Sequence, residues 1–205
     1  MLKAVLFDID GTIVDSKEAN IAFCQQIFQA AGYTPPEPER VSSLFHLPMT
    51  QLIEALATHL SAQEVQKLVA LRKNVSYPVN LQKIPLHSKK ILQSLSSMYK
   101  LAIVTSRSQQ GAKNYFSSAK SQDFFSTIVA IDDVQNPKPH PEPLLLATQR
   151  LGVDVREAVY IGDTHVDVAA AKAAKMKVIL RSTVPGADAY FTSFLQLPEI
   201  LSKII

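Results

Sequence analysis

The 205-residue sequence contains a single cysteine, Cys24, and no tryptophan. One cysteine excludes an internal disulfide and any metal site built from several cysteines. Charged residues make up only 19% of the chain and apolar residues 47%, a balance unlike that of a disordered chain. The sequence therefore describes a folded protein, and its length suits one domain or one core domain with a small insertion.

The sequence also has no large excess of either charge sign. The 21 Lys and Arg residues against 18 Asp and Glu residues leave a net charge of +3, too small to indicate a nucleic-acid or membrane surface. The first apolar run ends at Asp8, so the N-terminus predicts neither a signal peptide nor a membrane span. We expect a cytoplasmic protein with no nucleic-acid and no membrane partner, and the sequence leaves both a monomer and a dimer open.

Short apolar runs alternate with segments of helical period through most of the chain. The first run, residues 4–7, is continuously apolar, which is typical of a strand buried on both faces of a parallel sheet. The alternation predicts an α/β fold with a Rossmann-like parallel sheet. Similar runs cover residues 101–104, 128–131, 158–161 and 178–180, and a terminal helix is expected over residues 193–204.

Strand patterns disappear between residue 16 and about residue 85, where helical periods take their place. Within this interval Ser61 and Glu64 have the spacing of a capping box at the start of a helix. The apolar stripes of these helices are read as packing faces. We therefore predict a small all-helical cap over residues 16–84, inserted after the first strand of a core domain that spans residues 1–15 and 85–205.

Polar side chains follow three of the predicted strands. In an open α/β sheet, ligands bind outside the carboxyl ends of the strands. A single polar residue there is usually a helix cap or a loop acid, but three strands that bring polar groups to one edge favour a ligand site. The residues are Asp8 and Asp10 after the first strand, Thr105, Ser106 and Arg107 after the second, and Asp163 and Asp167 after the fourth.

The acids at this edge predict a metal site. Asp8, Asp10 and Asp163 would repel one another, because like carboxylates a few ångströms apart resist joint ionisation. A divalent cation relieves this repulsion, and oxygen ligands without several cysteines or clustered histidines favour Mg²⁺. Lys138 lies between prolines and adds a positive charge, and Thr105 with the following amides can donate to phosphate oxygens. The pattern predicts Mg²⁺ and a phosphate substrate.

Four segments at these positions resemble the motifs of the haloacid-dehalogenase-like (HAD) hydrolases, a superfamily dominated by Mg²⁺-dependent phosphatases. The helical interval is similar to the small cap of the phosphoglycolate-phosphatase and β-phosphoglucomutase branch. The resemblance implies a HAD-like core and covers almost the whole chain. Residues 7–16 resemble the first motif, residues 104–106 the second, Lys138 the third and residues 162–167 the fourth.

The resemblance also implies a mechanism. Asp8 would attack phosphorus and form an aspartyl-phosphate, and Asp10 would protonate the leaving oxygen and later deprotonate the attacking water. Asp8 and Asp163 would hold Mg²⁺ together with the backbone carbonyl of Asp10. Asp167 would ligate the metal directly or order its water.

Five residues are candidates for binding the substrate. Thr105, Ser106 and Lys138 would place donors on the phosphate and spread the charge of the transition state. His46 stands where related caps commonly carry glycine, so it either contacts the substrate or is a partly exposed cap residue. Arg107 either reaches a second anionic group of the substrate or forms an ion pair on the surface.

Three functions remain open from the sequence. The first is a Mg²⁺-dependent phosphomonoester hydrolase that acts on a small phosphorylated metabolite. A phosphosugar mutase of the β-phosphoglucomutase type would use the same aspartate but return the phosphoryl group to its substrate. A non-catalytic phosphate-binding domain also groups acids with a threonine and a lysine, although a receiver domain would carry its phosphoacceptor after a later strand.

Overall fold

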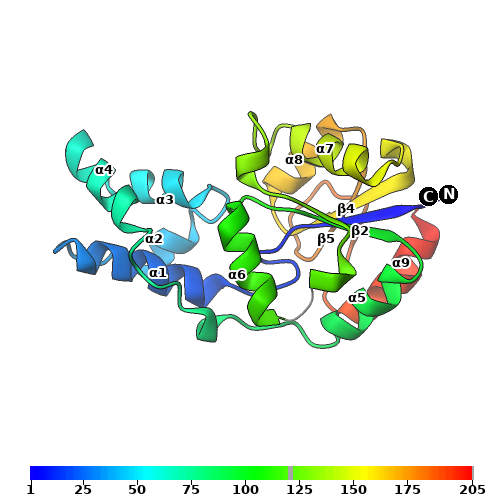
Figure 1. Cartoon of the computed structure of the whole chain (residues 1–205), viewed down its shortest axis with the longest axis horizontal. Helices are drawn as coiled ribbons and strands as arrows, with labels where there is room; N and C mark the ends of the chain where they lie inside the picture. Colours follow the sequence, from blue (N-terminus) through cyan, green and yellow to red (C-terminus); the bar gives the residue numbers. More distant parts are fainter. Residues whose placement is uncertain (120–121, 205) are drawn as a thin grey trace. The chain divides into compact units, whose positions relative to one another are not determined.

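The computed structural model describes residues 1–119 and 122–204. The chain divides into two compact units, an α/β unit of residues 1–15 and 84–205 and a helical unit of residues 16–83. Figure 1 shows the strands gathered in the α/β unit with helices around them. Each unit is built around a hydrophobic core of its own.

The sheet of the α/β unit is parallel, and its six strands have the order β3-β2-β1-β4-β5-β6. Phe7 of the central strand pairs with Ile103 on one side and Ile161 on the other. Every residue of this central strand is fully buried, so the predicted α/β fold with a parallel sheet is confirmed. The strands are β1 Ala4–Phe7, β2 Lys100–Val104, β3 Thr127–Val129, β4 Ala158–Gly162, β5 Lys177–Leu180 and β6 Ala189–Tyr190.

Helices cover both faces of the sheet (Figure 1). Because successive strand residues point to opposite faces, Val5 and Phe7 join one apolar cluster and Leu6 joins the other. The first cluster includes residues of α5, α6 and α9, and the second includes residues of α7 and α8. The helices are α5 Ser88–Ser96, α6 Gln109–Ala119, α7 Glu142–Leu151, α8 His165–Ala173 and α9 Leu197–Lys203.

The helical unit encloses a separate apolar core that includes Phe28, Leu52 and Leu68. Its last helix begins with the predicted capping box. The Ser61 backbone N–H donates to Glu64 Oε2 at 2.9 Å, and Ser61 Oγ accepts from the Glu64 backbone N–H at 3.4 Å. The helices are α1 Lys17–Ala30, α2 Pro38–Ser42, α3 Met49–Leu56 and α4 Ala62–Leu71.

Two elements differ from their predicted lengths. β3 ends at Val129, and residues 131–133 form a 3-10 helix instead of extending the strand to residue 131. The terminal helix begins at Leu197 rather than at residue 193, because Ser193 caps a short 3-10 helix over Phe194–Gln196. Pro198 suits the first turn of the α-helix that follows, where a missing N–H costs no hydrogen bond.

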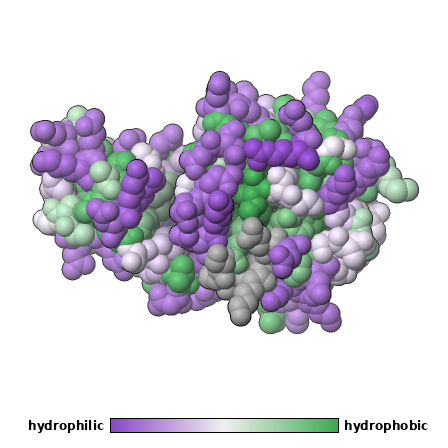
Figure 2. Space-filling model, viewed as in Figure 1, coloured by the Kyte–Doolittle hydropathy of each residue, from purple (hydrophilic) through white to green (hydrophobic). Residues whose placement is uncertain are grey.

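On the face of the molecule that Figure 2 shows, most of the outermost side chains are hydrophilic. Some large apolar side chains are exposed as well, including Leu86 and Leu195 of the α/β unit. Within the described ranges, no helix is both long enough and apolar enough to cross a bilayer.

Candidate active site

The loops at the carboxyl ends of β1, β2 and β4 carry most of the predicted site residues. Asp8 directly follows β1, Thr105 follows β2, and Asp163 follows β4. β1 lies between β2 and β4, so the strand order reverses direction at β1. Such a reversal is where open α/β sheets bind their ligands, and the polar loops meet there.

Three carboxylates converge at this edge. One oxygen from each of Asp8, Asp163 and Asp167 lies within 4.8 Å of the others. Gly11 brings the loop after β1 close to this group with a φ of +72°, and a Cβ at this position would collide with the Asp163 carboxylate. Only glycine combines that backbone conformation with that close approach. The side chain of Asp10 is not part of this acidic cluster.

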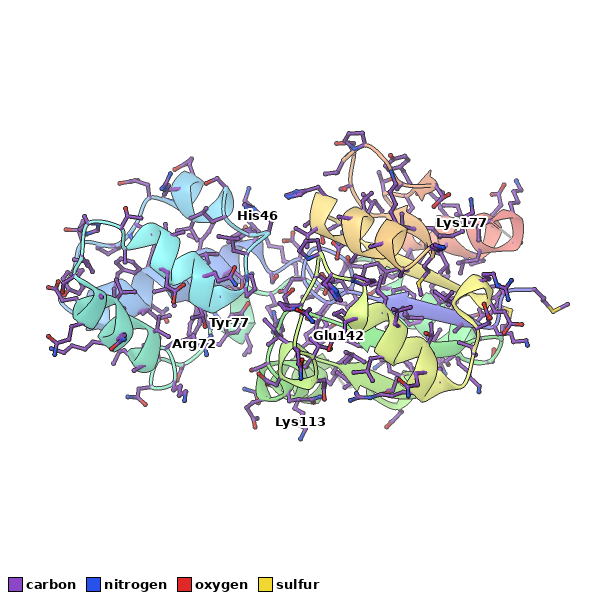
Figure 3. All side chains as sticks on the ribbon, turned by 90° about the horizontal axis from the view of Figure 1, so that it is seen from above. His46, Arg72, Tyr77, Lys113, Glu142 and Lys177 are labelled. Carbon is purple, nitrogen blue, oxygen red and sulfur yellow. The ribbon has the colours of Figure 1, made fainter. Side chains whose placement is uncertain are left out.

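Lys138 enters the cluster from the loop that precedes α7. Its Nζ lies 2.8 Å from Asp167 Oδ1 and 3.2 Å from Asp8 Oδ2, and its side chain is only 4% exposed. Glu142 lies at the start of α7 (Figure 3). It supports this loop by accepting hydrogen bonds from the backbone N–H groups of Gln135 and Asn136. The structure therefore fixes one ammonium group between two of the three carboxylates.

Asp167 is the most heavily bonded member of the cluster. It lies in the first turn of α8 and is buried. Its two oxygens accept from five donors, which exhausts the roughly four lone-pair directions of a carboxylate. The donors are Lys138 Nζ and Tyr160 Oη to Oδ1, and the Asp163 N–H, the Thr164 N–H and Thr164 Oγ1 to Oδ2.

The environment changes the acidity of the three carboxyl groups. Burial raises the pKa of Asp8 to about 7, against the attraction of Lys138. Burial and the neighbouring acids raise the pKa of Asp163 to about 8. Burial also disfavours the charge of Asp167, but the Lys138 ammonium and the hydrogen bonds to this carboxylate hold its pKa below the usual value. One ammonium therefore stands against three carboxyl groups, and a divalent cation would supply further positive charge.

Asp10 and Arg107 form a bidentate ion pair. Arg107 Nε donates to Asp10 Oδ2 and Nη2 donates to Oδ1, both at 2.7 Å. The guanidinium carbon also lies 5.9 Å from the centre of the Tyr115 ring. The side chains are 14% and 31% exposed for Arg107 and Asp10. The sequence left two roles open for Arg107, a contact with the substrate or an ion pair on the surface. Arg107 does form an ion pair, but this pair is partly buried.

The remaining predicted residues lie in two places. Thr105 is buried, and its Oγ1 accepts a hydrogen bond of 3.2 Å from the backbone N–H of Arg107. Ser106 lies between them and is half-buried. His46 belongs to the helical unit, in the segment between α2 and α3 (Figure 3), and is half-buried as well.

Tyr160 is a residue of this region that the sequence did not reveal. It lies inside β4 and is fully buried, and its hydroxyl contacts Lys138 Nζ at 2.8 Å and Asp167 Oδ1 at 2.9 Å. In the sequence it was simply one apolar position of a predicted strand. The available signal was a tyrosine two residues before Gly162 in an otherwise aliphatic run.

Comparisons with known proteins agree with this arrangement. The pyrophosphatase PpaX of Bacillus pumilus is 30% identical over 196 residues, which cover 93% of this chain and 88% of the relative. The phosphoglycolate phosphatase of Salmonella typhi is 30% identical over 201 residues, with 84% and 78% covered. The crystal structure of a HAD-superfamily hydrolase of subfamily IA from Geobacter sulfurreducens superimposes with a TM-score of 0.78 at 27% identity, with 98% of this chain and 96% of that chain covered.

The model of the family described as haloacid dehalogenase-like hydrolase matches residues 5–181. This range includes β1, β2 and β4 and the loops that carry the acidic cluster. The chain is therefore an enzyme of the haloacid dehalogenase-like hydrolase family, as its four motifs predicted.

Proposed function

We propose that this protein is a Mg²⁺-dependent phosphomonoester hydrolase that acts on a small phosphorylated metabolite. The observation that carries the proposal is the acidic cluster of Asp8, Asp163 and Asp167 around the buried ammonium of Lys138. Carboxylates that need a cation, next to a fixed positive charge, suit a substrate that brings phosphate oxygens. The names of the pyrophosphatase and phosphoglycolate phosphatase relatives support a phosphorylated substrate.

The donor set of the cluster fits Mg²⁺. All of its side-chain ligands are oxygens, and burial together with the neighbouring acids raises the pKa of Asp8 and Asp163 although the Lys138 ammonium lies close by. We assign the ion to these two residues and the backbone carbonyl of Asp10. When bound, it would supply positive charge between the nucleophile and the phosphate. Asp167, with five donors on its oxygens, is better suited to hold Lys138 and the loop after β4.

Asp8 is the proposed nucleophile. The backbone N–H of Ile9 donates to its Oδ1 at 2.7 Å, and Lys138 approaches its Oδ2 at 3.2 Å, so the carboxylate has a defined orientation. Its attack forms a bond from oxygen to phosphorus while the bond from phosphorus to the leaving oxygen breaks. Water then attacks the aspartyl-phosphate, which releases inorganic phosphate and restores the carboxylate.

Asp10 is the proposed general acid and base. Its proton would pass to the leaving oxygen in the first step, and its carboxylate would take a proton from water in the second. Arg107 holds both oxygens of this carboxylate, so it would set the direction in which Asp10 faces. Thr105, Ser106 and Lys138 would donate to the phosphoryl oxygens.

The helical unit is the proposed cap, with His46 as a candidate for contacting the part of the substrate beyond the phosphate. A unit of residues 16–83 is small, which favours a compact metabolite. Pyrophosphate and phosphoglycolate are therefore the first two substrates to test, because they are named for relatives that share 30% identity with this chain.

Phosphate release from a panel of substrates tests the proposal. The panel contains an aryl phosphate, pyrophosphate, phosphoglycolate and several sugar phosphates, each with Mg²⁺ and with a chelator. We expect release that requires Mg²⁺, stops with the chelator and returns when Mg²⁺ is added in excess. Isomerised sugar phosphate without free phosphate would favour the mutase alternative. No release and no phosphorylated Asp8 would contradict an enzymatic role in phosphate transfer.

A further inference from the structure

Tyr160 is buried in a place where its hydroxyl is not needed for packing. It occupies β4, is fully buried, and belongs to the apolar cluster beneath α7 and α8 together with Leu6, Val104 and Leu144. A phenylalanine would fill the same volume. A hydroxyl removed from water costs free energy unless it is hydrogen-bonded, so the partners of this hydroxyl indicate its role.

Those partners are residues of the active site. Lys138 Nζ donates to the Tyr160 hydroxyl at 2.8 Å. The hydroxyl has one proton to give, and it faces Asp167 Oδ1 at 2.9 Å and the Val104 carbonyl at 3.3 Å. The shorter contact to a charged acceptor is the stronger one. The hydroxyl therefore accepts from the ammonium and donates to the carboxylate, both of which are buried.

The ammonium of Lys138 has three N–H groups and three oxygens close to it. It donates hydrogen bonds to Tyr160 Oη and Asp167 Oδ1, both at 2.8 Å, and makes an ion-pair contact with Asp8 Oδ2 at 3.2 Å. An ammonium with one hydrogen bond can rotate about its terminal bond, whereas two hydrogen bonds in different directions fix all three N–H directions. With two N–H groups held by Tyr160 and Asp167, the third is left on the side of Asp8.

We propose that Tyr160 is a positioning residue that orients the Lys138 ammonium toward Asp8 and toward the phosphoryl group carried there. This inference rests on the proposed function, in which Asp8 is the nucleophile. Tyr160 lies beneath the ammonium in the sheet and acts through Lys138 rather than on the substrate. Its hydroxyl matters most when charge develops on the phosphoryl oxygens, because an oriented donor stabilises the transition state more than the bound substrate.

Tyr160→Phe tests this role, since it removes one oxygen and keeps the ring. We expect kcat to fall by about 10- to 100-fold, as for other residues that orient an active-site group through hydrogen bonds, while KM changes by less than about threefold because the charge of Lys138 remains. Thr148→Val is the matched control, because it removes another buried hydroxyl beneath the same face, whose partner is the Leu145 carbonyl at 2.9 Å. It should leave kcat unchanged even if its Tm falls.

A second readout does not depend on activity. The ¹H and ¹⁵N signals of the Lys138 ammonium should be observable in the native protein, because two hydrogen bonds, the ion pair with Asp8 and burial slow its proton exchange with water. They should broaden or disappear in Tyr160→Phe and persist in Thr148→Val. A kcat within twofold of native with unchanged ammonium signals would overturn the proposal, as would equal losses of kcat in both variants or an absence of the signals in the native protein. If the native protein released no phosphate, the proposed function would fail while the ammonium signals still tested Tyr160.

Discussion

The two units of the chain bury different kinds of residue. In the α/β unit, the charged side chains of Asp8, Lys138 and Asp167 are buried together. In the helical unit, Ser16 is the one buried polar residue among those that the structure describes, and the core is apolar. Buried charges destabilise a fold unless they are paired and hydrogen-bonded. The proposed function therefore assigns the chemistry to the α/β unit and the choice of substrate to the helical unit.

The sheet of the α/β unit provides both an apolar core and a charged site. Aliphatic residues of β1 and β4 fill both apolar clusters, while the residues just past the strand ends carry the charges. Tyr160 connects the apolar core and the charged site, because its ring lies in the core and its hydroxyl in the site. A substitution among the charged residues of the site should therefore affect catalysis strongly, and it should raise or lower the free energy of unfolding according to the charge that it removes. A substitution in the helical unit should affect mainly substrate choice.

Asp8→Asn should have the largest effect. Because an amide cannot act as the nucleophile, kcat should fall by at least about 10³-fold on every substrate. Steady-state phosphate release measures the loss, and Asp123→Asn, an exposed substitution in the same unit, is the control that should keep native kcat. Turnover of Asp8→Asn within tenfold of the native rate would remove Asp8 from the mechanism.

Asp163→Asn should weaken the metal site and yet stabilise the metal-free protein. Loss of a proposed ligand should raise the Mg²⁺ concentration for half-maximal activity by about 10- to 100-fold. The Asp163 pKa of about 8 in the folded chain lies above its usual value of 3.8. In the native protein, its contribution to the free energy of unfolding is therefore best at low pH and is lost as pH rises toward 8.

The substitution removes this pH-dependent loss. In the presence of a chelator, the Tm of Asp163→Asn should exceed the native Tm at pH 9, by about 2–4 °C for each kcal/mol gained, and the difference should shrink as pH falls to 5. Thermal melts at the two pH values measure it. A native Tm that equals or exceeds the variant's at pH 9 without metal would show that burial and the neighbouring acids do not destabilise the Asp163 carboxylate.

Arg107→Gln should have an intermediate effect that depends on the leaving group. Without the bidentate contact, Asp10 loses its fixed orientation, so substrates with poor alkyl leaving groups should lose about tenfold in kcat. Aryl phosphates leave without a proton from Asp10, so the single-turnover rate at which they transfer phosphate to Asp8 should be nearly unaffected. Arg150→Gln breaks an ion pair with Asp133 in the same unit and serves as the control. Equal losses of the single-turnover rate on aryl and alkyl phosphates would instead favour direct binding of the substrate by Arg107.

His46→Ala should have the smallest effect and the most selective one. If His46 contacts the substrate, KM should rise a few-fold and the ranking of substrates should change, while kcat on an aryl phosphate stays near native. His59→Ala is the matched control, because His59 is an exposed histidine of the same unit. Identical losses on all substrates would contradict a role for His46 in specificity.

The sequence by itself determined most of the strands and which polar residues follow them. Apolar runs of strand length placed β1, β2, β4 and β5 to within a residue or two. The capping box of Ser61 and Glu64 marked the start of α4, because its partners are three residues apart. The acids after the strands could be grouped because parallel strands bring their carboxyl ends to one edge of a sheet.

Only the tertiary structure decided which charges pair. Arg107 lies 97 positions from Asp10, and Tyr160 lies 22 positions from Lys138. Neither contact leaves a local pattern, because a strand needs only an apolar side chain at residue 160 and a loop accepts arginine at residue 107. Periodicity reports which face a side chain takes, whereas hydrogen-bond partners depend on how distant segments meet in three dimensions.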